Sequence, residues 1–381
     1  MSAFRPMSRG TGLYVHVPFC RIKCHYCDFA CYPGLEDRIG SYVEAVGREW
    51  SCYPGDTEVA SLYVGGGTPS LLEPGDVHKL AGLLRGRGNW TQLAEATFEV
   101  NPGTGGPELW RALRETGFRR ISMGVQVMDD ALLCAIGRDH GVADVLRTTQ
   151  ELRAEGLSDL SMDLIYGLPG QEPEHWAETL EQVIRLQPPH LSLYSLQIEE
   201  RTLFGVRAAQ GRLEVPDEDR VRTMHDHAVV RLAAAGYRRY EIASWCLPGH
   251  ESVHNRIYWT HRPFIGLGVG AHSWDGVRRY AHDRSFRTYM ADPIPRRDVS
   301  PEPDDLSFDT ALIMGLRLVE EGVDLEVFTE RFGQDPFVVH GKALEGFLAE
   351  GLLERHGNCI RLAPEAIPVA NGIFSALLRD S

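Results

Sequence analysis

Short apolar runs and longer amphipathic stretches alternate over the first two thirds of the chain. The short runs are rich in aliphatic, aromatic and β-branched residues, which favours buried strands. The predicted strands are residues 13–17, 61–64, 96–100, 120–125, 160–165, 191–197 and 239–244. Between them, apolar residues recur with the 3.6-residue period of a helix that packs one face on a core. The predicted helices are residues 36–51, 74–85, 106–115, 142–155, 174–186 and 217–235.

Glycines mark the ends of three of these helices. Gly117, Gly156 and Gly236 each follow a helical run, where glycine readily takes the left-handed conformation that ends a helix. Repeated strand–helix units predict a parallel sheet, because parallel neighbours need helical crossovers. About six such units predict an α/β fold built as a barrel or partial barrel, with an open doubly wound sheet as the alternative.

The pattern changes after about residue 283, and residues 292–297 (Asp-Pro-Ile-Pro-Arg-Arg) indicate a linker. We therefore predict a barrel domain at 1–283 and a small, mostly helical domain at 300–381. Helical patterns cover 308–320, 325–332, 338–350 and 370–378. Residues 352–362, interrupted by His-Gly-Asn, indicate a wing-like β-hairpin.

Composition and charge narrow the functional classes. Of 381 residues, 43% are hydrophobic and 24% charged, an ordinary globular balance. The net charge of −14 opposes binding to phosphate backbones, so no nucleic-acid partner is expected. Residues 1–12 have no apolar core of signal-peptide length, and no apolar run is long enough to span a membrane. A cytoplasmic protein without an integral membrane segment is expected.

Four of the eight cysteines lie within twelve residues, directly after the first predicted strand. The group Cys20-Arg-Ile-Lys-Cys24-His-Tyr-Cys27 supplies three soft thiolates from one loop. Thiolates suit iron–sulfur clusters and zinc. Three thiolates can hold one face of a [4Fe–4S] cluster and leave the fourth iron open to a small molecule. The alternative is a structural zinc site that uses Cys24, Cys27 and His16 or His25.

The C-x3-C-x2-C spacing, with Tyr26 before the last cysteine, resembles the motif of radical S-adenosylmethionine (SAM) proteins. The flanking residues 14–19 (Tyr-Val-His-Val-Pro-Phe) and 28–29 (Asp-Phe) resemble the anaerobic coproporphyrinogen III oxidase family. This resemblance implies a partial (β/α)6 barrel and a [4Fe–4S] cluster on Cys20, Cys24 and Cys27. The family uses only these three cysteines, so Cys31 is expected not to bind the cluster.

The same resemblance implies a SAM site at the carboxyl ends of the strands, where α/β barrels build their sites. Its glycine turn is Gly65-Gly66-Gly67-Thr68-Pro69. Glu99 and Asp163 would face the sugar or the polar groups of methionine, and Arg138 would bind the carboxylate. The SAM residues implied by the resemblance are Tyr14, Tyr26, Gly66, Gly67, Thr68, Glu99, Gln126, Arg138 and Asp163.

Residues 245–282 are rich in histidine and aromatic residues, which suit a flat macrocycle and an axial iron ligand. The segment His254-Asn255-Arg-Ile-Tyr258-Trp259 resembles a signature of the HemW-type heme-chaperone branch of the same family. Phe29, where the oxidases carry another cysteine, and the short N-terminus agree with that branch. The resemblance implies heme contacts from His254, Asn255, Tyr258 and Trp259, with His254 a candidate axial ligand.

Three functions stay open from the sequence. The first is a heme chaperone that binds heme and transfers it to an acceptor protein. The second is an oxygen-independent coproporphyrinogen III oxidase, in which SAM-dependent radical chemistry decarboxylates porphyrinogen propionates. The third is an electron carrier or redox sensor whose cluster is closed by Cys31. We favour the first, and no catalytic residue is assigned.

Overall fold

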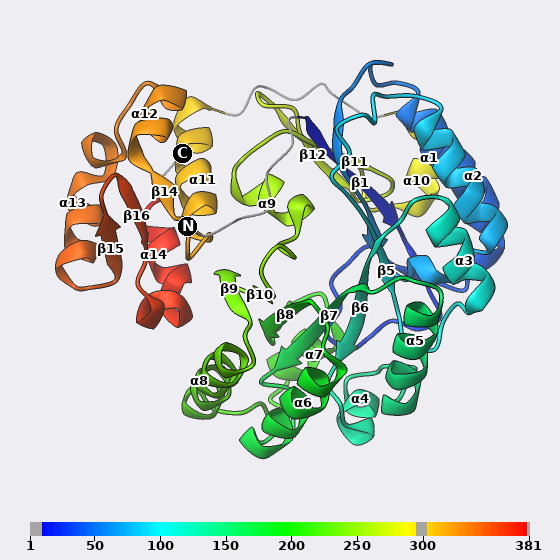
Figure 1. Ribbon diagram of the computed structural model, residues 1–381, viewed down its shortest axis with the longest axis horizontal. Coiled ribbons are helices and arrows are strands. Elements are labelled where there is room, and N and C mark those ends of the chain that lie inside the picture. Colours follow the sequence, from blue (N-terminus) through cyan, green and yellow to red (C-terminus); the bar gives the residue numbers. More distant parts are fainter. Residues whose placement is uncertain (1–9, 295–302, 379–381) are drawn as a thin grey trace.

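Six parallel strands, in the order in which they occur along the chain, form the centre of one large sheet (Figure 1). The computed structural model describes residues 10–294 and 303–378. The six strands are β1 (Thr11–Val17), β4 (Val59–Gly66), β5 (Glu95–Val100), β6 (Arg120–Gln126), β7 (Asp159–Tyr166) and β8 (His190–Ser195). Sequential strand order is that of a barrel, so the predicted partial (β/α)6 barrel is confirmed and the doubly wound alternative is wrong.

Helices connect these strands and cover the convex face of the sheet (Figure 1). They are α1 (Ile39–Trp50), α2 (Pro74–Arg85), α3 (Pro107–Glu115), α5 (Val142–Ala154), α6 (Pro173–Leu186) and α8 (Glu218–Ala234). Each lies within the range predicted from the periodicity or one residue beyond it. Gly117, Gly156 and Gly236 have φ angles of 86°, 83° and 88°, which confirms the predicted left-handed helix ends.

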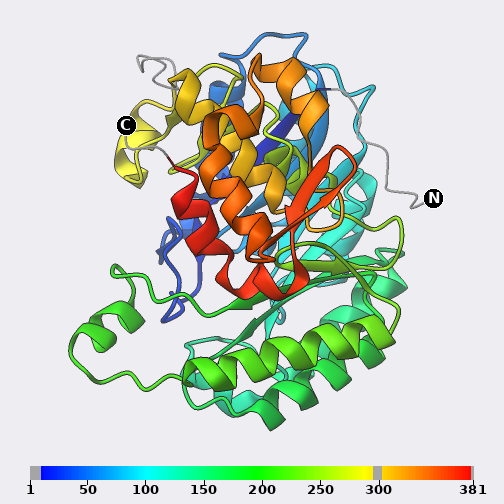
Figure 2. The same ribbon diagram turned by 90° about the vertical axis from the view of Figure 1, so that its left-hand side faces the viewer.

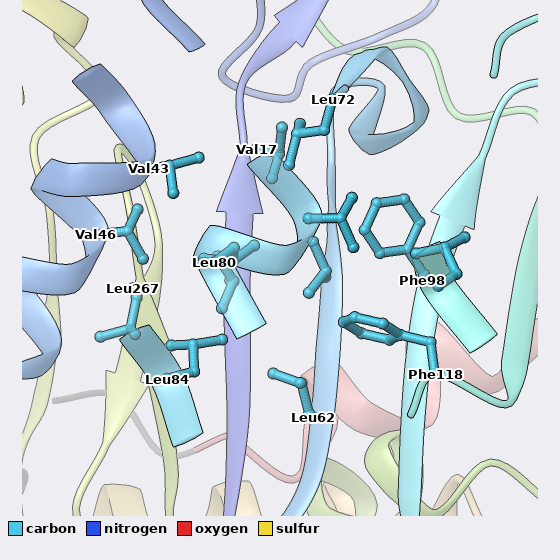
Figure 3. Close-up of a cluster of buried hydrophobic side chains, with 14 of the residues drawn as sticks. Val17, Val43, Val46, Leu62, Leu72, Leu80, Leu84, Phe98, Phe118 and Leu267 are labelled. Carbon is cyan, nitrogen blue, oxygen red and sulfur yellow. The ribbon is translucent and has the colours of Figure 1, made fainter. Parts of the chain in front are cut away.

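The main hydrophobic core lies between the sheet and its helices (Figure 3). Val43 and Val46 of α1, Leu80 and Leu84 of α2 and Leu62 of β4 are all buried in this cluster. The three- and four-residue spacings place each pair on one face of its helix. Burying each of these side chains contributes roughly 1.5–3 kcal/mol.

Both edges of the sheet differ from the sequence-based prediction. The predicted strand at 239–244 is wrong, because the chain reverses there and forms the antiparallel pair β9 (Arg238–Glu241) and β10 (Ser244–Cys246). At the other edge, the sequence did not predict β11 (Phe264–Leu267), β12 (His272–Trp274) or β13 (Arg279–Ala281). β9 and β13 are the terminal strands of the sheet, so the barrel stays open.

Several short elements complete the barrel. They are β2 (Phe19–Cys20), β3 (Tyr32–Pro33), α4 (Asp130–Ala135), α7 (Leu203–Ala209), α9 (Val253–Trp259) and α10 (Phe286–Ala291). Phe286 and Tyr289 of α10 belong to the barrel core, so the barrel extends beyond the domain boundary predicted at 283. The predicted linker at 292–297 lies partly outside the described residues.

The C-terminal domain packs four helices around a small sheet. The helices are α11 (Asp304–Leu316), α12 (Leu325–Phe332), α13 (Pro336–Ala349) and α14 (Ala370–Ala376). The strands are β14 (Val323–Asp324), β15 (Leu353–His356) and β16 (Cys359–Leu362), and β15 and β16 form the predicted hairpin. Within residues 10–294 and 303–378, no helix is long and apolar enough to cross a membrane.

The C-terminal domain lies against α9 and the β9–β10 edge of the barrel (Figures 1 and 2). Arg256 of α9 forms an ion pair with Glu321 at 2.7 Å. Arg238 of β9 forms another with Glu320 at 3.0 Å. The backbone N–H of Ile242 also donates to the carbonyl of Arg317 at 3.1 Å. Polar contacts from α9 and β9 therefore fix the domain beside the barrel.

Candidate functional site

The cysteine cluster lies on a loop that is closed at its base. β2 ends at Cys20 and pairs with β3, so that Phe19 lies beside Tyr32 and Cys20 beside Pro33. The N–H of Tyr32 also donates to the carbonyl of Pro18 at 2.7 Å. Because β2 directly follows β1, this loop is fixed at the carboxyl end of the central strands.

The thiols of this loop line a cavity of about 930 Å³. The guanidinium of Arg138 donates to the Cys24 Sγ and the hydroxyl of Thr68 donates to the Cys20 Sγ, each at 3.6 Å. Such donors favour the thiolate, the form that binds metal, and they oppose the burial that raises the pKa of Cys24. Among the described residues, no three His, Cys, Asp or Glu side chains converge on one metal ion. Three soft thiolates on one loop are the donor set that a [4Fe–4S] cluster takes, with each thiolate on a different iron.

Cys31 belongs to the same group of thiols. It is buried, lines the cavity and interacts by hydrogen bonds with both Cys20 and Cys27. The contact with Cys31 lowers the pKa of Cys20, whereas the contact with Cys31 and then burial raise the pKa of Cys27. The resemblance had implied that Cys31 does not bind the cluster, whereas the alternative of a cluster closed by Cys31 had placed it beside the other ligands.

The glycine turn after β4 passes directly beneath the cysteine loop. The N–H of Gly67 donates to the carbonyl of Val17 at 2.8 Å, and the N–H of Thr68 donates to that of Phe19 at 2.7 Å. A Cβ on Gly66 would lie 2.5 Å from the His16 ring, and a Cβ on Gly67 would lie 2.6 Å from the Phe19 carbonyl. Gly66 also has a φ of 115°. Only glycine allows this approach.

Two partly buried carboxylates face the cavity from strands β5 and β7. Glu99 of β5 accepts hydrogen bonds from the hydroxyl of Tyr63 at 2.8 Å and the N–H of Gly66 at 2.9 Å. Asp163 of β7 accepts one from the hydroxyl of Ser122 at 2.9 Å. Burial raises the pKa of Glu99 to about 7 and also raises that of Asp163. Both groups are suited to a ligand that brings positive charge or hydroxyl donors.

Arg138 is held rigidly between the cysteine loop and β6. Its Nη2 donates to the Asn101 Oδ1 at 2.8 Å and to the carbonyl of Gly124 at 2.9 Å. Gln126, at the end of β6, has a φ of 67°, and the pairing of β6 with β7 shifts register there. The shift turns the end of β6 toward the cavity, where Gln126 and Arg138 both lie.

The structure therefore brings the predicted cluster and SAM residues together around one cavity. The lining includes Cys20, Cys24 and Cys27 with Tyr14, Tyr26, Gly66, Gly67, Thr68, Glu99, Gln126, Arg138 and Asp163. The polar lining residues that the sequence reasoning missed include Tyr63, Asn101, Ser122, Ser192 and Tyr194. Tyr63 precedes Gly65 by two residues, so the two-residue alternation of a strand could have placed it on the same face.

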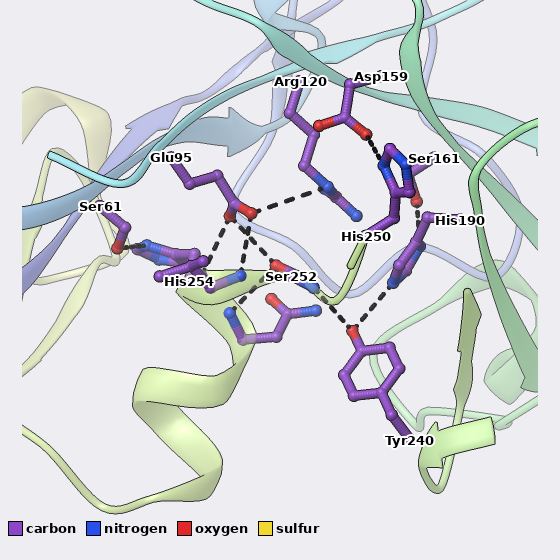
Figure 4. Close-up of polar contacts among 12 residues, drawn as sticks. Ser61, Glu95, Arg120, Asp159, Ser161, His190, Tyr240, His250, Ser252 and His254 are labelled. Carbon is purple, nitrogen blue, oxygen red and sulfur yellow. Dashed lines mark hydrogen bonds and ion pairs between the residues drawn. The ribbon is translucent and has the colours of Figure 1, made fainter. Parts of the chain in front are cut away.

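A second polar group occupies the opposite, amino end of the strands, and we call it the floor network (Figure 4). It consists of Ser61, Glu95, Arg120, Asp159, Ser161, His190, Tyr240, His250, Ser252 and His254. Glu95 accepts hydrogen bonds from the N–H groups of Val253 and His254, at 2.9 and 3.1 Å. It also forms an ion pair with Arg120 at 4.0 Å. The carboxylate thereby caps α9 and ties it to the barrel.

His254 makes two hydrogen bonds inside this network. Its Nδ1 lies 2.8 Å from the Ser61 hydroxyl, and its Nε2 lies 2.8 Å from the Tyr258 hydroxyl. The side chain is 1% exposed, and burial lowers its pKa to about 4. Both ring nitrogens are thus engaged. Ligation of a heme iron by His254, which the resemblance implies, would require one of these bonds to break.

The four predicted heme residues occupy different surroundings. Asn255 and Tyr258 line the cavity that the cysteines also line, whereas His254 and Trp259 are not part of its lining. Trp259 instead packs beneath the guanidinium of Arg317, whose carbon lies 4.2 Å from the ring centre. The segment therefore reaches the cavity, the floor network and the C-terminal domain at once.

Comparisons with known proteins agree with this architecture. Residues 14–183 match the model of the radical SAM superfamily, and residues 310–369 match that of the HemN C-terminal domain. The solved structure of coproporphyrinogen III oxidase (HemN) from Escherichia coli, described as a radical SAM enzyme, covers 98% of this chain and 91% of its own. Its TM-score is 0.84 at 24% identity, which shows a common fold. The fold and the site thus define a radical SAM protein.

Two curated relatives give the branch of that superfamily. Heme chaperone HemW of Lactococcus lactis is 31% identical over 376 residues, 98% of this chain and 99% of the relative. Heme chaperone HemW of Escherichia coli is 37% identical over 281 residues, 72% of each chain. The chain belongs to the HemW branch of the anaerobic coproporphyrinogen III oxidase family, as the resemblance of its motifs had indicated. Membership of the radical SAM superfamily implies SAM and a [4Fe–4S] cluster as cofactors.

Proposed function

We propose that the chain is a [4Fe–4S] protein that binds heme and transfers it to an acceptor protein. The observation that carries the proposal is the match, over almost its whole length, to a relative named heme chaperone HemW. The cavity supports it, because the cysteine loop, the SAM residues and part of the heme segment all line one space. Clustered cysteines that bind a metal cluster suit a reducing compartment, and we propose that the protein is cytoplasmic.

Cys20, Cys24 and Cys27 would hold the cluster, which supplies electrons for chemistry on SAM when it is bound. The chain's own groups then position SAM. Arg138, already fixed by Asn101 and Gly124, offers its planar guanidinium to a carboxylate. Glu99 and Asp163 offer carboxylates to the ammonium and hydroxyl groups, and the backbone at Gly66 and Gly67 allows close approach.

Heme would bind in the part of the same cavity that the predicted heme segment lines. Asn255 and Tyr258 line it, and Phe264 packs edge-on against Tyr258 with ring centres 4.7 Å apart. These rings give the apolar wall that a macrocycle needs. We propose that His254 positions the Tyr258 ring through its hydrogen bond to the hydroxyl. Trp259 would connect the segment to the C-terminal domain through its contact with Arg317.

Oxygen-independent coproporphyrinogen III oxidase is the second candidate. It is favoured by the complete set of cluster and SAM residues around one cavity, which is what SAM-dependent radical chemistry needs. Phe29 argues against it, since the oxidases carry a cysteine at that position. Phe29 lines the cavity and is 65% exposed.

Anaerobic incubation of the reconstituted protein separates the two functions. One sample receives heme and then heme-free myoglobin as an acceptor, and the other receives coproporphyrinogen with SAM. We expect stable heme binding, delivery to the acceptor and no decarboxylated porphyrinogen. Decarboxylation at many turnovers per chain, without heme retention, would establish the oxidase instead. Cys24→Ala, which lacks one cluster ligand, is the matched control for every step that depends on the cluster.

A further inference from the structure

Cys31 differs in its surroundings from the other cysteines outside the C-x3-C-x2-C motif. Cys52 and Cys134 are exposed, and Cys246 and Cys359 are not part of the cavity lining. Cys31 is 8% exposed and lines the cavity. The structure thus places a fourth thiol where the three predicted cluster ligands lie.

The position of Cys31 is fixed by the backbone on both sides. The next residue, Tyr32, pairs with Phe19 in the β2–β3 ladder. The preceding residue, Ala30, accepts a hydrogen bond from the His16 Nε2 at 2.7 Å. Cys31 is therefore held across the base of the loop that carries the other three thiols, and it contacts Cys20 and Cys27. A thiol fixed in this way loses little conformational entropy on binding metal.

We propose that Cys31 is an exchangeable fourth ligand, which binds the open iron of the cluster when SAM is absent and leaves when SAM binds. This inference rests on the proposed cluster on Cys20, Cys24 and Cys27. In the exchange the iron–sulfur bond to Cys31 breaks, and the released thiolate takes up one proton from solvent. The polar groups of SAM replace it on the iron, and no electron is transferred.

A chain of hydrogen bonds connects the SAM pocket with the position of Cys31. The hydroxyl of Tyr14, which lines the cavity, lies 2.9 Å from the His16 Nδ1. The other ring nitrogen of His16 binds the carbonyl of Ala30, next to Cys31. Burial lowers the pKa of His16 to about 4, so the ring stays neutral and passes one hydrogen bond on each side. A ligand that moves Tyr14 would thereby move the backbone that carries Cys31.

Two consequences follow for the protein without SAM. The fourth iron would be protected from loss, because all four corners of the cluster carry protein ligands. SAM would also have to compete with Cys31, so its apparent affinity would be reduced by the fraction of molecules in which the iron is open. Neither effect is expected if Cys31 does not bind the iron.

The test compares the reconstituted full-length wild type with Cys31→Ala, and uses Cys134→Ala, an exposed cysteine, as the matched control. Mild ferricyanide oxidation without SAM, followed by electron paramagnetic resonance, measures conversion to a three-iron cluster. We expect faster loss of the fourth iron in Cys31→Ala than in the wild type or Cys134→Ala. Calorimetry should show SAM binding about tenfold tighter in Cys31→Ala, if about one molecule in ten has an open iron.

Equal rates of iron loss and equal SAM affinities in all three proteins would overturn the inference. Cys31→Ser, which keeps a small polar side chain at this buried position, repeats the comparison if Cys31→Ala folds poorly. The proposed function fails separately, when the wild type assembles no cluster or Cys24→Ala retains a complete one. Loss of iron in Cys24→Ala with no effect of Cys31→Ala would overturn only the role of Cys31.

Discussion

The two ends of the barrel carry similar side chains in different arrangements. At the carboxyl end, Glu99, Asp163 and Arg138 line a cavity of about 930 Å³. At the amino end, Glu95 and His254 are bonded to other groups of the protein. Of the floor network, only Arg120 and Ser161 reach the cavity lining. One end therefore has polar groups available for a ligand, whereas the other uses them to hold the fold.

This difference shows that residue type alone does not assign a function. Histidine and glutamate are typical of binding sites, yet at the floor each meets a protein partner that offsets the cost of burying it. His190 illustrates this, since its ring nitrogens bind Ser161 and Tyr240 at 2.8 and 2.9 Å. The partners of a buried polar group, which only the fold reveals, decide whether it binds a ligand or stabilises the protein.

The largest effect is expected from the cysteine loop. Cys24→Ala removes one of the three predicted cluster thiolates, so the reconstituted protein should lose its cluster. The measurement is iron content per chain after anaerobic reconstitution. Cys134→Ala, at an exposed position on α4, should keep the wild-type iron content. A Cys24→Ala protein with wild-type iron would show that the cluster lies elsewhere.

The floor network should affect stability strongly. Glu95→Ala leaves Arg120 without its ion-pair partner and two N–H groups of α9 without an acceptor. Breaking such a buried pair costs roughly 3–5 kcal/mol of unfolding free energy. Urea denaturation of the cluster-free protein measures the loss, and Glu44→Gln, at an exposed position on α1, is the control. An unchanged denaturation midpoint in Glu95→Ala would show that the floor network does not stabilise the fold.

A matched pair on strand β7 compares the two ends directly. Asp163 lies at the cavity, and Asp159 lies at the floor, 3.1 Å from His250. Asp163→Ala should weaken SAM binding ten- to hundredfold, since one hydrogen bond to a charged group contributes about 1.5–3 kcal/mol. Asp159→Ala should lower stability and leave SAM affinity unchanged. Calorimetry measures the SAM affinity of both variants. Equal affinities would contradict the claim that the carboxyl end binds SAM and the amino end stabilises the fold.

The two ends should also respond to pH in opposite ways. Burial raises the pKa of Glu99 from 4.5 to about 7, so its contribution to stability is complete below pH 4.5 and is lost as pH rises through 7. Burial lowers the pKa of His254 from 6.5 to about 4, so its contribution is complete above pH 6.5 and is lost as pH falls through 4. The measurement is the denaturation midpoint across this pH range. Glu99→Gln should remove the loss of stability as pH rises, and His254→Gln should remove the loss of stability as pH falls.

Titration of Glu99 should produce the smallest effect, on SAM binding. Its carboxylate forms as pH rises through about 7, and a carboxylate attracts the ammonium group of SAM. SAM affinity should therefore rise severalfold between pH 6 and pH 8. Glu99→Gln should remove this rise, whereas Glu44→Gln should preserve it. A pH dependence that survives in Glu99→Gln would assign it to another group.

The sequence predicted the barrel and its carboxyl end well because local signals decide both. Strand–helix alternation implies parallel strands, and parallel strands bring Glu99, Gln126 and Asp163 to one end. The sequence-based prediction missed the edge strands β11, β12 and β13, which have three or four residues each. Such short strands depend on pairing with neighbours that are distant in the sequence. The position of His254 is equally non-local, since it depends on contacts with Glu95 and Ser61.

The spectrum of heme bound to folded His254→Ala protein tests most directly the claim that ligand binding is confined to the carboxyl end. The account predicts a Soret band at the wild-type position, together with a lower unfolding temperature, because the variant loses the bonds to Ser61 and Tyr258. A shifted Soret band and lost heme retention, in a variant that unfolds at the wild-type temperature, would contradict it. That result would establish His254 as the axial ligand of the heme iron.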